Sequence, residues 1–223
     1  MNKFCLGILI SGALLSGCAS NNKVTDDKYS GFLSDYSILK TTPSDKDTLG
    51  YVNRDVNWKK YNSVMVDKVV VITPDGDIKT DDELLIAIAD QFHELIIQKL
   101  SDNFTIVNTP GSSTIRIQPA ITSVFTSHDD LKGYQYIPIA AAVVGASRAT
   151  GAAKKSARVM SEVKMIDSVD GELLAQAVDL KAGGKVQDED SGILLADVKP
   201  TLEQWAQRID DRITSLQKAI NSQ

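Results

Sequence analysis

Residues 157–180 read ARVMSEVKMIDSVDGELLAQAVDL and determine what kind of sheet the chain forms. Two apolar-rich runs, residues 157–166 and 173–180, lie on either side of the polar segment 167–172. Within that segment, Asp170-Gly171 is typical of a tight turn between antiparallel strands. These residues therefore predict a β-hairpin, and with it an antiparallel sheet.

A strand and a helix are predicted upstream of this hairpin. Residues 64–72 form a dense β-branched run, which is typical of a buried strand. Thr80-Asp81-Asp82-Glu83 matches a helix capping box, in which the hydroxyl and the Glu three residues later satisfy unpaired backbone N–H groups. The apolar residues that follow recur at helical spacing up to about Ser101: Leu85, Ile88, Ala89, Phe92, Leu95, Ile96 and Leu100.

Two further strands are expected between this helix and the hairpin. Residues 104–107 form a short apolar run before a turn at Pro110-Gly111. Residues 114–126 alternate between apolar and polar side chains, as in a half-buried strand. Pro119 lies inside this run and has no N–H group to donate, which indicates a sheet edge or a bulge at that point.

The last predicted element is a helix that begins near Pro200. Its apolar stripe is formed by Leu202, Trp205, Ile209, Ile213, Leu216 and Ile220. The order strand, helix, three or four strands, helix predicts an α+β fold. We expect one domain over residues 61–223, with a mostly antiparallel sheet of four to five strands and two helices packed on one face.

Composition excludes several classes of protein. The 223 residues are 43% hydrophobic and 24% charged, which is typical of a globular chain. The 24 basic and 29 acidic residues give a net charge of −5, which argues against nucleic acid as a partner. Two Cys and two His residues leave little for a disulfide framework or a metal site, so we expect neither a metal nor a cofactor.

The N-terminal residues predict export and lipidation. A basic residue, Lys3, precedes the apolar run of residues 4–15, which is shorter than the ~20 residues that a membrane-spanning helix needs. This pattern predicts a signal peptide over residues 1–17. Leu15-Ser16-Gly17-Cys18 resembles the bacterial lipobox, which implies cleavage before Cys18 and diacylglycerol and palmitate chains on that residue. A plain secretory signal cut nearby is the alternative.

The residues after Cys18 predict a tether and a location. Ala19 and Ser20 follow the lipid site, and by resemblance to the sorting rule of enteric lipoproteins the lack of Asp there implies the outer membrane. Residues 18–60 are expected to hold the lipidated Cys, a polar tether and an extended strap. The strap carries six apolar side chains that we expect to pack against the domain: Tyr29, Phe32, Leu33, Tyr36, Ile38 and Leu39. An arm that binds a partner is the alternative.

Residues 137–153 are unusually rich in Ala and Gly. Gly145-Ala146-Ser147-Arg148-Ala149 comes close to a nucleophile elbow, but no His follows His128 to complete a hydrolase triad. The segment is best interpreted as a helix or buried strand packed closely within the same domain. The functional alternative is a surface that another backbone can approach closely, and its candidate contact residues are Ala140, Ala141, Val144, Gly145, Ala149 and Gly151.

Two acidic clusters could suggest metal binding, and each has a simpler explanation. Asp75, Asp77 and Asp81 fall in a turn and a helix start, and Lys79 stands where an EF-hand calcium loop needs a ligand. His128-Asp129-Asp130 lacks co-ligands nearby in the chain. We therefore assign no catalytic residue and no metal ligand.

Three motifs together resemble a known family. They are the lipobox, Tyr29-Ser30-Gly31-Phe32-Leu33 with Asp35-Tyr36, and the run from Tyr51-Val52-Asn53 through Asp55-Val56-Asn57-Trp58 to Tyr61. They are similar to bacterial lipoproteins grouped as domain of unknown function 3313. The biochemistry of that family is unassigned, so the resemblance implies an envelope lipoprotein and transfers no catalytic residue.

These observations lead to one functional hypothesis and one alternative. We expect a periplasm-facing lipoprotein of the outer membrane that is not an enzyme. It would serve as an interaction or accessory subunit of an envelope assembly, binding another envelope protein or a second copy of itself. The alternative is a small-ligand binder that holds a lipid or glycan between the sheet and the helices.

Overall fold

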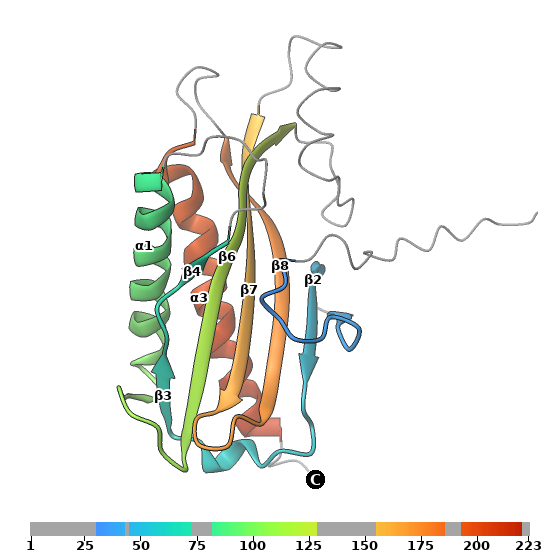
Figure 1. Cartoon of the computed structure of the whole chain (residues 1–223), viewed down its shortest axis with the longest axis vertical. Helices are drawn as coiled ribbons and strands as arrows, with labels where there is room; N and C mark the ends of the chain where they lie inside the picture. Colours follow the sequence, from blue (N-terminus) through green and yellow to red (C-terminus); the bar gives the residue numbers. More distant parts are fainter. Residues whose placement is uncertain (1–29, 43–44, 73–81, 129–154, 186–192, 220–223) are drawn as a thin grey trace, which may run out of the picture.

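The computed structural model describes residues 30–42, 45–72, 82–128, 155–185 and 193–219 (Figure 1). Its strands are β1 (Lys40–Thr42), β2 (Asp45–Val52), β3 (Ser63–Val66), β4 (Val70–Val71), β5 (Thr105–Ile106), β6 (Thr114–His128), β7 (Lys155–Asp167) and β8 (Leu173–Lys185). Its helices are the 3-10 helix η2 (Trp58–Lys60) and the α-helices α1 (Asp82–Leu100) and α3 (Leu195–Ala219). Neither α-helix in these ranges has the length and apolar character needed to cross a membrane.

The two α-helices form where the apolar periodicity predicted them. In α1 the buried side chains are the seven predicted ones, from Leu85 to Leu100. In α3, Leu202, Trp205 and Ile213 are buried in the same way. This helix begins five residues before Pro200, so the proline lies in its second turn. The missing N–H is tolerated there because the carbonyl that it leaves unpaired belongs to an exposed part of the helix.

The sheet is larger than predicted, and it is mixed. Within the described residues it has eight strands, seven of them in the order β1-β2-β8-β7-β6-β3-β5, and β4 pairs with β6. The expectation of four to five mostly antiparallel strands was therefore wrong. β3 pairs in parallel with β5 and β6, and β4 pairs in parallel with β6, because α1 carries the chain across the sheet between β4 and β5. β1 and β2 were not predicted, since Asp45-Lys46-Asp47 and Gly50 give β2 a composition that is unusual for a strand.

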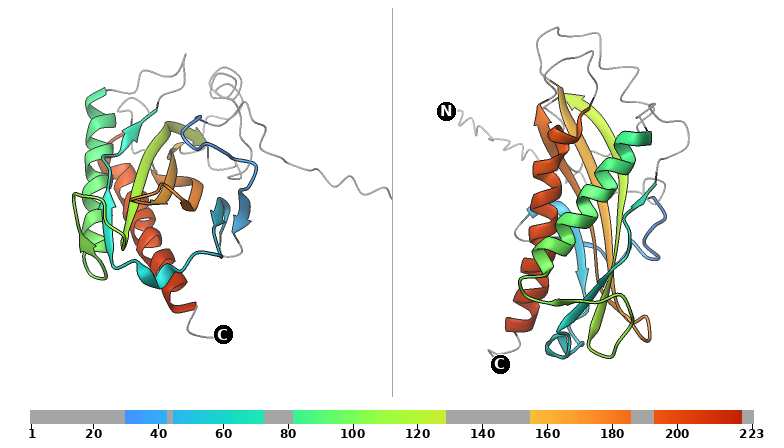
Figure 2. Two further views of the ribbon diagram at one scale, coloured as in Figure 1. Left: turned by 60° about the horizontal axis from the view of Figure 1, so that its bottom comes forward. Right: turned by 90° about the vertical axis from the view of Figure 1, so that its left-hand side faces the viewer.

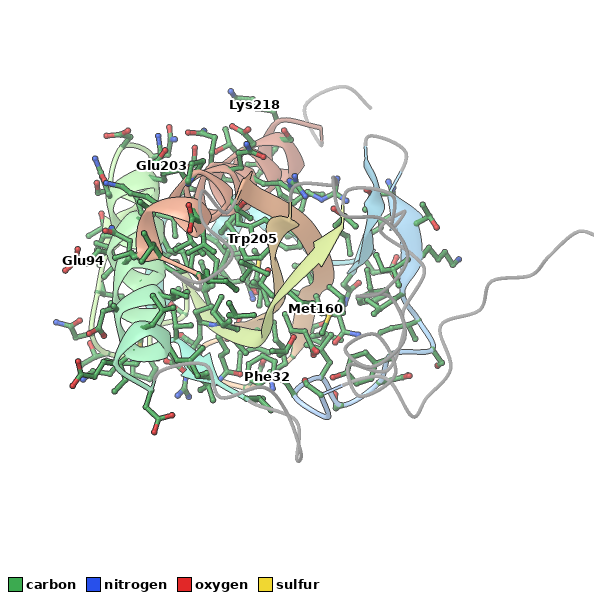
Figure 3. All side chains as sticks on the ribbon, turned by 90° about the horizontal axis from the view of Figure 1, so that it is seen from above. Phe32, Glu94, Met160, Glu203, Trp205 and Lys218 are labelled. Atoms are coloured by element: carbon green, nitrogen blue, oxygen red, sulfur yellow. The ribbon has the colours of Figure 1, made fainter. Side chains whose placement is uncertain are left out.

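The helices cover one face of the sheet and enclose the main core. Figures 1 and 2 show α1 beside β3, β4 and β6, and α3 beside it over β7 and β8. The rings of Phe92 and Trp205 meet between the two helices, 5.8 Å apart. Figure 3 shows Trp205 among the side chains between α3 and the sheet. Ile117, Leu174 and Leu202 are fully buried in this layer.

Residues 30–39, here called the strap segment, lie across the opposite face of β7 and β8. Leu33 is buried there against Met160 and Val178. The Tyr36 hydroxyl donates a hydrogen bond to Oε2 of the fully buried Glu162, at 2.6 Å. Burial, and then this hydrogen bond, raise the pKa of Tyr36. The side-chain amide of Gln176 donates a further hydrogen bond to the backbone oxygen of Asp35.

Pro119 lies inside a central strand without breaking it. On one side it pairs with Val163 of β7. On the other side it lies opposite the break between β3, which ends at Val66, and β4, which begins at Val70. At that break no strand needs a backbone hydrogen bond from position 119, and proline has no N–H group to give one. The proline therefore occupies a local edge of the sheet and not a bulge.

The packing of α1 makes a stability prediction. Ile88 is fully buried, whereas Ile86 on the opposite side of the same helix is 60% exposed. We expect Ile88→Ala to lower the free energy of unfolding by about 2–5 kcal/mol, through lost burial and the cavity left behind. Ile86→Ala is the matched control, with an expected change within about 0.5 kcal/mol. Urea denaturation measures both, and equal losses would contradict the burial described here.

Candidate functional site

An open groove lies between α3 and the β1–β2 side of the sheet. Because α1 and α3 cover β3 to β8, no helix among the described residues lies over the helix-side face of β1 and β2 (Figure 2). The groove has a volume of about 310 Å³. It is lined from the sheet by β1, β2, β7 and β8, and from the helix by Trp205, Arg208, Ile209, Asp211, Arg212 and Ser215.

Strand register arranges the floor of the groove in three rows across β2, β8 and β7. The first row is Thr48, Asp179 and Ser161; the second is Gly50, Ala177 and Val163; and the third is Val52, Ala175 and Met165. The first row is polar, whereas the second and third are apolar and mostly small. Since side chains on one face recur every second residue, the three rows share the helix-side face. The floor therefore changes from polar to apolar along its length.

A buried charge network closes the polar end. Thr48 Oγ1 donates to Asp179 Oδ2 at 2.8 Å, and Arg208 Nη1 donates to Thr48 Oγ1 at 2.7 Å. Arg208 also forms an ion pair with Asp179, which is almost fully buried. The carboxylate of Asp179 is thus matched by a guanidinium from α3. This network fixes the distance between α3 and the sheet at the first row.

Two other hydrogen-bond donors along the groove do not face a carboxylate as Arg208 does. Trp205 is 3% exposed, and its Nε1 has no hydrogen-bond partner among the described residues. Arg212 lies one turn after Arg208 on the exposed rim, and no described residue forms an ion pair with it. A buried N–H without an acceptor is costly, so an acceptor brought by a ligand would be favoured there.

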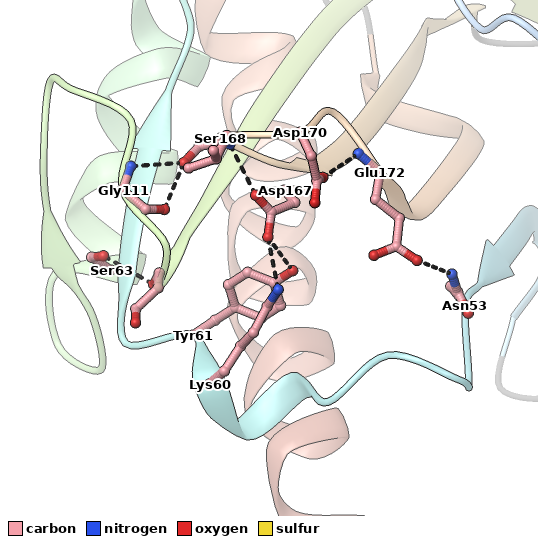
Figure 4. A network of polar contacts seen from close by, with 11 residues as sticks. Asn53, Lys60, Tyr61, Ser63, Gly111, Asp167, Ser168, Asp170 and Glu172 are labelled. Carbon is pink, nitrogen blue, oxygen red and sulfur yellow. Dashed lines mark hydrogen bonds and ion pairs between the residues drawn. The ribbon is translucent and has the colours of Figure 1, made fainter.

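A second polar cluster lies at the far end of the sheet, around the turn between β7 and β8 (Figure 4). The buried Asp167 accepts from Lys60 Nζ and Tyr61 Oη, each at 2.9 Å, and from the Val169 N–H. Ser168 bonds through its hydroxyl to both backbone groups of Gly111. The cluster ties the turn to η2 and to the loop before β6.

The charges of this cluster are mutually satisfied. Burial alone would raise the pKa of Asp167, but the hydrogen bonds from Lys60, Val169 and Tyr61 lower it to about 2. The hydrogen bond to Asp167 raises the pKa of Lys60. Burial, and then the bond to Asp167, raise the pKa of Tyr61 to about 12. All three groups are held in one protonation state over the physiological range, which fits a structural role.

The structure describes only some of the residues that were singled out from the sequence. Cys18 and the candidate contact residues, from Ala140 to Gly151, lie outside the described residues, as does Ser147. Asp75, Asp77 and Asp81 do so as well. His93 is half-buried on α1, with Nδ1 3.2 Å from the backbone oxygen of Asp67. No group of three potential metal ligands occurs within the part of the chain that the structure describes.

The alternative drawn from the sequence placed a ligand between the sheet and the helices, but it named none of the groove residues, although part of their signal was readable. Ala175, Ala177 and Asp179 alternate within the predicted hairpin, so one face of this strand is small and ends in a carboxylate. Their partners Thr48 and Gly50 lie on a strand that was not predicted. No local pattern connects these residues with α3, about 160 positions along the chain from Thr48.

The Asp167 cluster makes a pH-dependent prediction. The folded pKa of Asp167 is depressed from 3.8 to about 2, so its contribution is complete above pH 3.8 and is lost as pH falls toward 2. We expect Asp167→Asn to lower the free energy of unfolding at pH 7 by roughly 2 kcal/mol. The difference from wild type should shrink between pH 4 and pH 2 in urea titrations. Asp170→Asn in the same turn is the control, and equal losses in both variants at every pH would contradict this role.

Comparisons with known proteins give one uncharacterized lipoprotein over most of the chain and solved structures of low similarity. The uncharacterized lipoprotein YdcL of Escherichia coli K12 is 29% identical over 196 residues, which are 86% of this chain and 87% of YdcL. Among solved structures, XCC0632 from Xanthomonas campestris has a TM-score of 0.46 at 11% identity, covering 72% of this chain and 88% of XCC0632. A PelC dodecamer from Paraburkholderia phytofirmans has a TM-score of 0.39 at 10% identity, covering 73% and 95%.

A family model also matches most of the chain. The model described as "Protein of unknown function (DUF3313)" matches residues 28–209. These residues include the strap segment, every strand of the sheet and the part of α3 that carries Trp205 and Arg208. The resemblance expected from the sequence motifs is thereby confirmed, and the chain belongs to the DUF3313 family.

Proposed function

We propose that this chain is an outer-membrane lipoprotein that faces the periplasm and acts by binding, not by catalysis. The lipobox ending at Cys18 supports the anchor, and the similarity to a protein named as a lipoprotein agrees with it. Ala19 and Ser20 support the outer membrane over the inner one. Two acyl chains or more on Cys18 would make the attachment stable, since one chain alone binds only marginally.

The function that the geometry supports best is the binding of a small ligand in the groove beside α3. The observation that carries this proposal is the groove itself, with its buried polar end and its apolar floor. Its volume of about 310 Å³ falls at the lower end of the range for small-molecule sites. Sites of this kind combine a mostly apolar lining with a few placed polar groups, as the rows from Thr48 to Val52 do.

A second candidate function is that of an accessory subunit of an envelope assembly. It rests on the small residues between Ala140 and Gly151, which would let another protein or a second copy approach closely. Figure 1 shows that β6 and β7 run past the end of α1. His128 and Lys155, the last described residue of β6 and the first of β7, therefore lie beyond that end of the helix.

Ligand binding is tested by native mass spectrometry of the full-length lipidated protein, released from mild detergent. We expect a retained small-molecule mass on the wild type. Ala177→Leu fills the second row of the floor, so the mass should be lost in that variant. Ala196→Leu, at an exposed position on α3, is the matched control and should keep the mass. A wild type with no added mass, or a mass kept by Ala177→Leu, would refute binding in the groove.

The accessory role is tested by mild extraction followed by chemical cross-linking and peptide mapping. We expect a stoichiometric partner or a defined homo-oligomer, with cross-links near residues 140–155. Bulky substitutions at Ala141, Gly145 and Ala149 should remove these cross-links, because they block close approach of a second backbone. Unchanged assembly in those variants would show that the segment is not the contact.

A further inference from the structure

We propose that the groove beside α3 takes a single-chain amphiphile with an anionic head, that is, one acyl or alkyl chain joined to a carboxylate or phosphate. This inference rests on the proposed small-ligand function and specifies the class of ligand. Its chain would lie on the apolar rows, and its head would lie toward the guanidinium groups of α3. Three features of the groove support it: the shape of the floor, the buried N–H of Trp205 and the exposed guanidinium of Arg212.

The floor accommodates one narrow chain. From Asp179 to Ala175 it extends about 13 Å along β8. Over its second and third rows the side chains from β2 and β8 are Gly50, Val52, Ala177 and Ala175, so a chain can approach the backbone closely. The volume of about 310 Å³ favours one chain over two. Burial of methylene groups on these rows would contribute about 0.8 kcal/mol for each group.

The same rows disfavour a glycan. Sugar hydroxyls need hydrogen-bonding partners when they are buried, and the side chains of the second and third rows offer none. Trp205 is the aromatic residue from α3 that lines the groove, but it is 3% exposed and packs against Phe92. Its ring face is therefore taken by the core and is not presented as a platform for a sugar.

The groove is lined by two carboxylates, Asp179 and Asp211, and by two guanidinium groups, Arg208 and Arg212. Asp179 is matched by Thr48 and Arg208. Asp211 lies on the same rim and accepts a hydrogen bond from Gln207 at 3.0 Å. Arg212 faces the groove mouth, and no described residue forms an ion pair with it. A guanidinium binds carboxylate and phosphate groups through paired N–H donors, so either head fits this position.

The buried indole supplies the remaining contact. Trp205 lines the groove, and its Nε1 is a buried donor without an acceptor among the described residues. A carboxylate, ester or phosphate oxygen at the polar end of the ligand would accept this hydrogen bond. The N–H of Trp205 thus lacks an acceptor among the described residues, and the exposed guanidinium of Arg212 is open to one, so the head of an anionic amphiphile can bond to either group.

Photolabelling of the full-length lipidated protein in phosphatidylcholine nanodiscs tests the proposal. The probe is a twelve-carbon fatty acid with a terminal diazirine, and its uncharged glycerol ester serves as the neutral comparison. We expect the acid to label peptides of β2, β8 and α3, and Ala177→Leu to reduce that labelling at least about tenfold. Arg212→Gln should reduce labelling by the acid about tenfold and leave labelling by the ester unchanged.

Matched variants and competitors make the result specific. Ala196→Leu and Lys218→Gln are the controls for Ala177→Leu and Arg212→Gln, at exposed positions of α3 outside the groove. The probe should label both control variants as strongly as the wild type. Competition by dodecanoate and by dodecyl phosphate identifies whether the preferred head is a carboxylate or a phosphate. Stronger competition by either compound agrees with the proposal.

Two outcomes would overturn it, and they are distinguishable from failure of the proposed function. If Ala177→Leu labels like the wild type, the probe binds elsewhere and the groove is not its site. If Arg212→Gln affects the acid and the ester equally, the anionic head is wrong. In either case a co-purified mass that is lost in Ala177→Leu would still support small-ligand binding, whereas its absence would remove both proposals.

Discussion

The hydrogen-bond register of β8 against β2 and β7 is the constraint on which the rest of the structure depends. It places Ala175, Ala177 and Asp179 under α3 and places Gln176 and Val178 under the strap segment. A slip of one residue would exchange these two sets between the faces of the sheet. The turn that precedes β8 helps to fix the register, because Gly171 there adopts a φ of +77°, which other residues rarely adopt.

What could be predicted from the sequence was the part that depends on local pattern. The hairpin of β7 and β8 follows from alternation around Asp170-Gly171, and α1 and α3 follow from apolar residues at helical spacing. The strand β2 could not be predicted, since Gly50 and its polar neighbours are stabilised by pairing with β8, more than 120 residues away. The residues of the candidate groove were missed for the same reason: the groove exists only where β2, β8 and α3 meet.

The two faces of β7 and β8 have different partners and different chemistry. On the helix side, Asp179 is paired with a guanidinium, and small side chains leave a groove open. On the other side, Glu162 is fully buried and receives the hydroxyl of Tyr36 from the strap segment. In both cases one oxygen of a carboxylate inside the sheet accepts a hydrogen bond from an element packed on it, which stabilises a specific position of that element. α3 and the strap segment are thus positioned by the same two strands.

The place of the strap segment has a mechanical consequence. The strap segment is the first described part of the chain, so a pull applied from the N-terminal side reaches residues 30–39 before it reaches the sheet. That load falls on the contact between Tyr36 and Glu162 and on the apolar packing of Leu33, in the middle of β7 and β8. The short strands β1 and β5 at the two edges of the sheet do not bear this load first. Under tension the domain would therefore yield first by detachment of the strap segment, with the sheet, its core and the groove still intact.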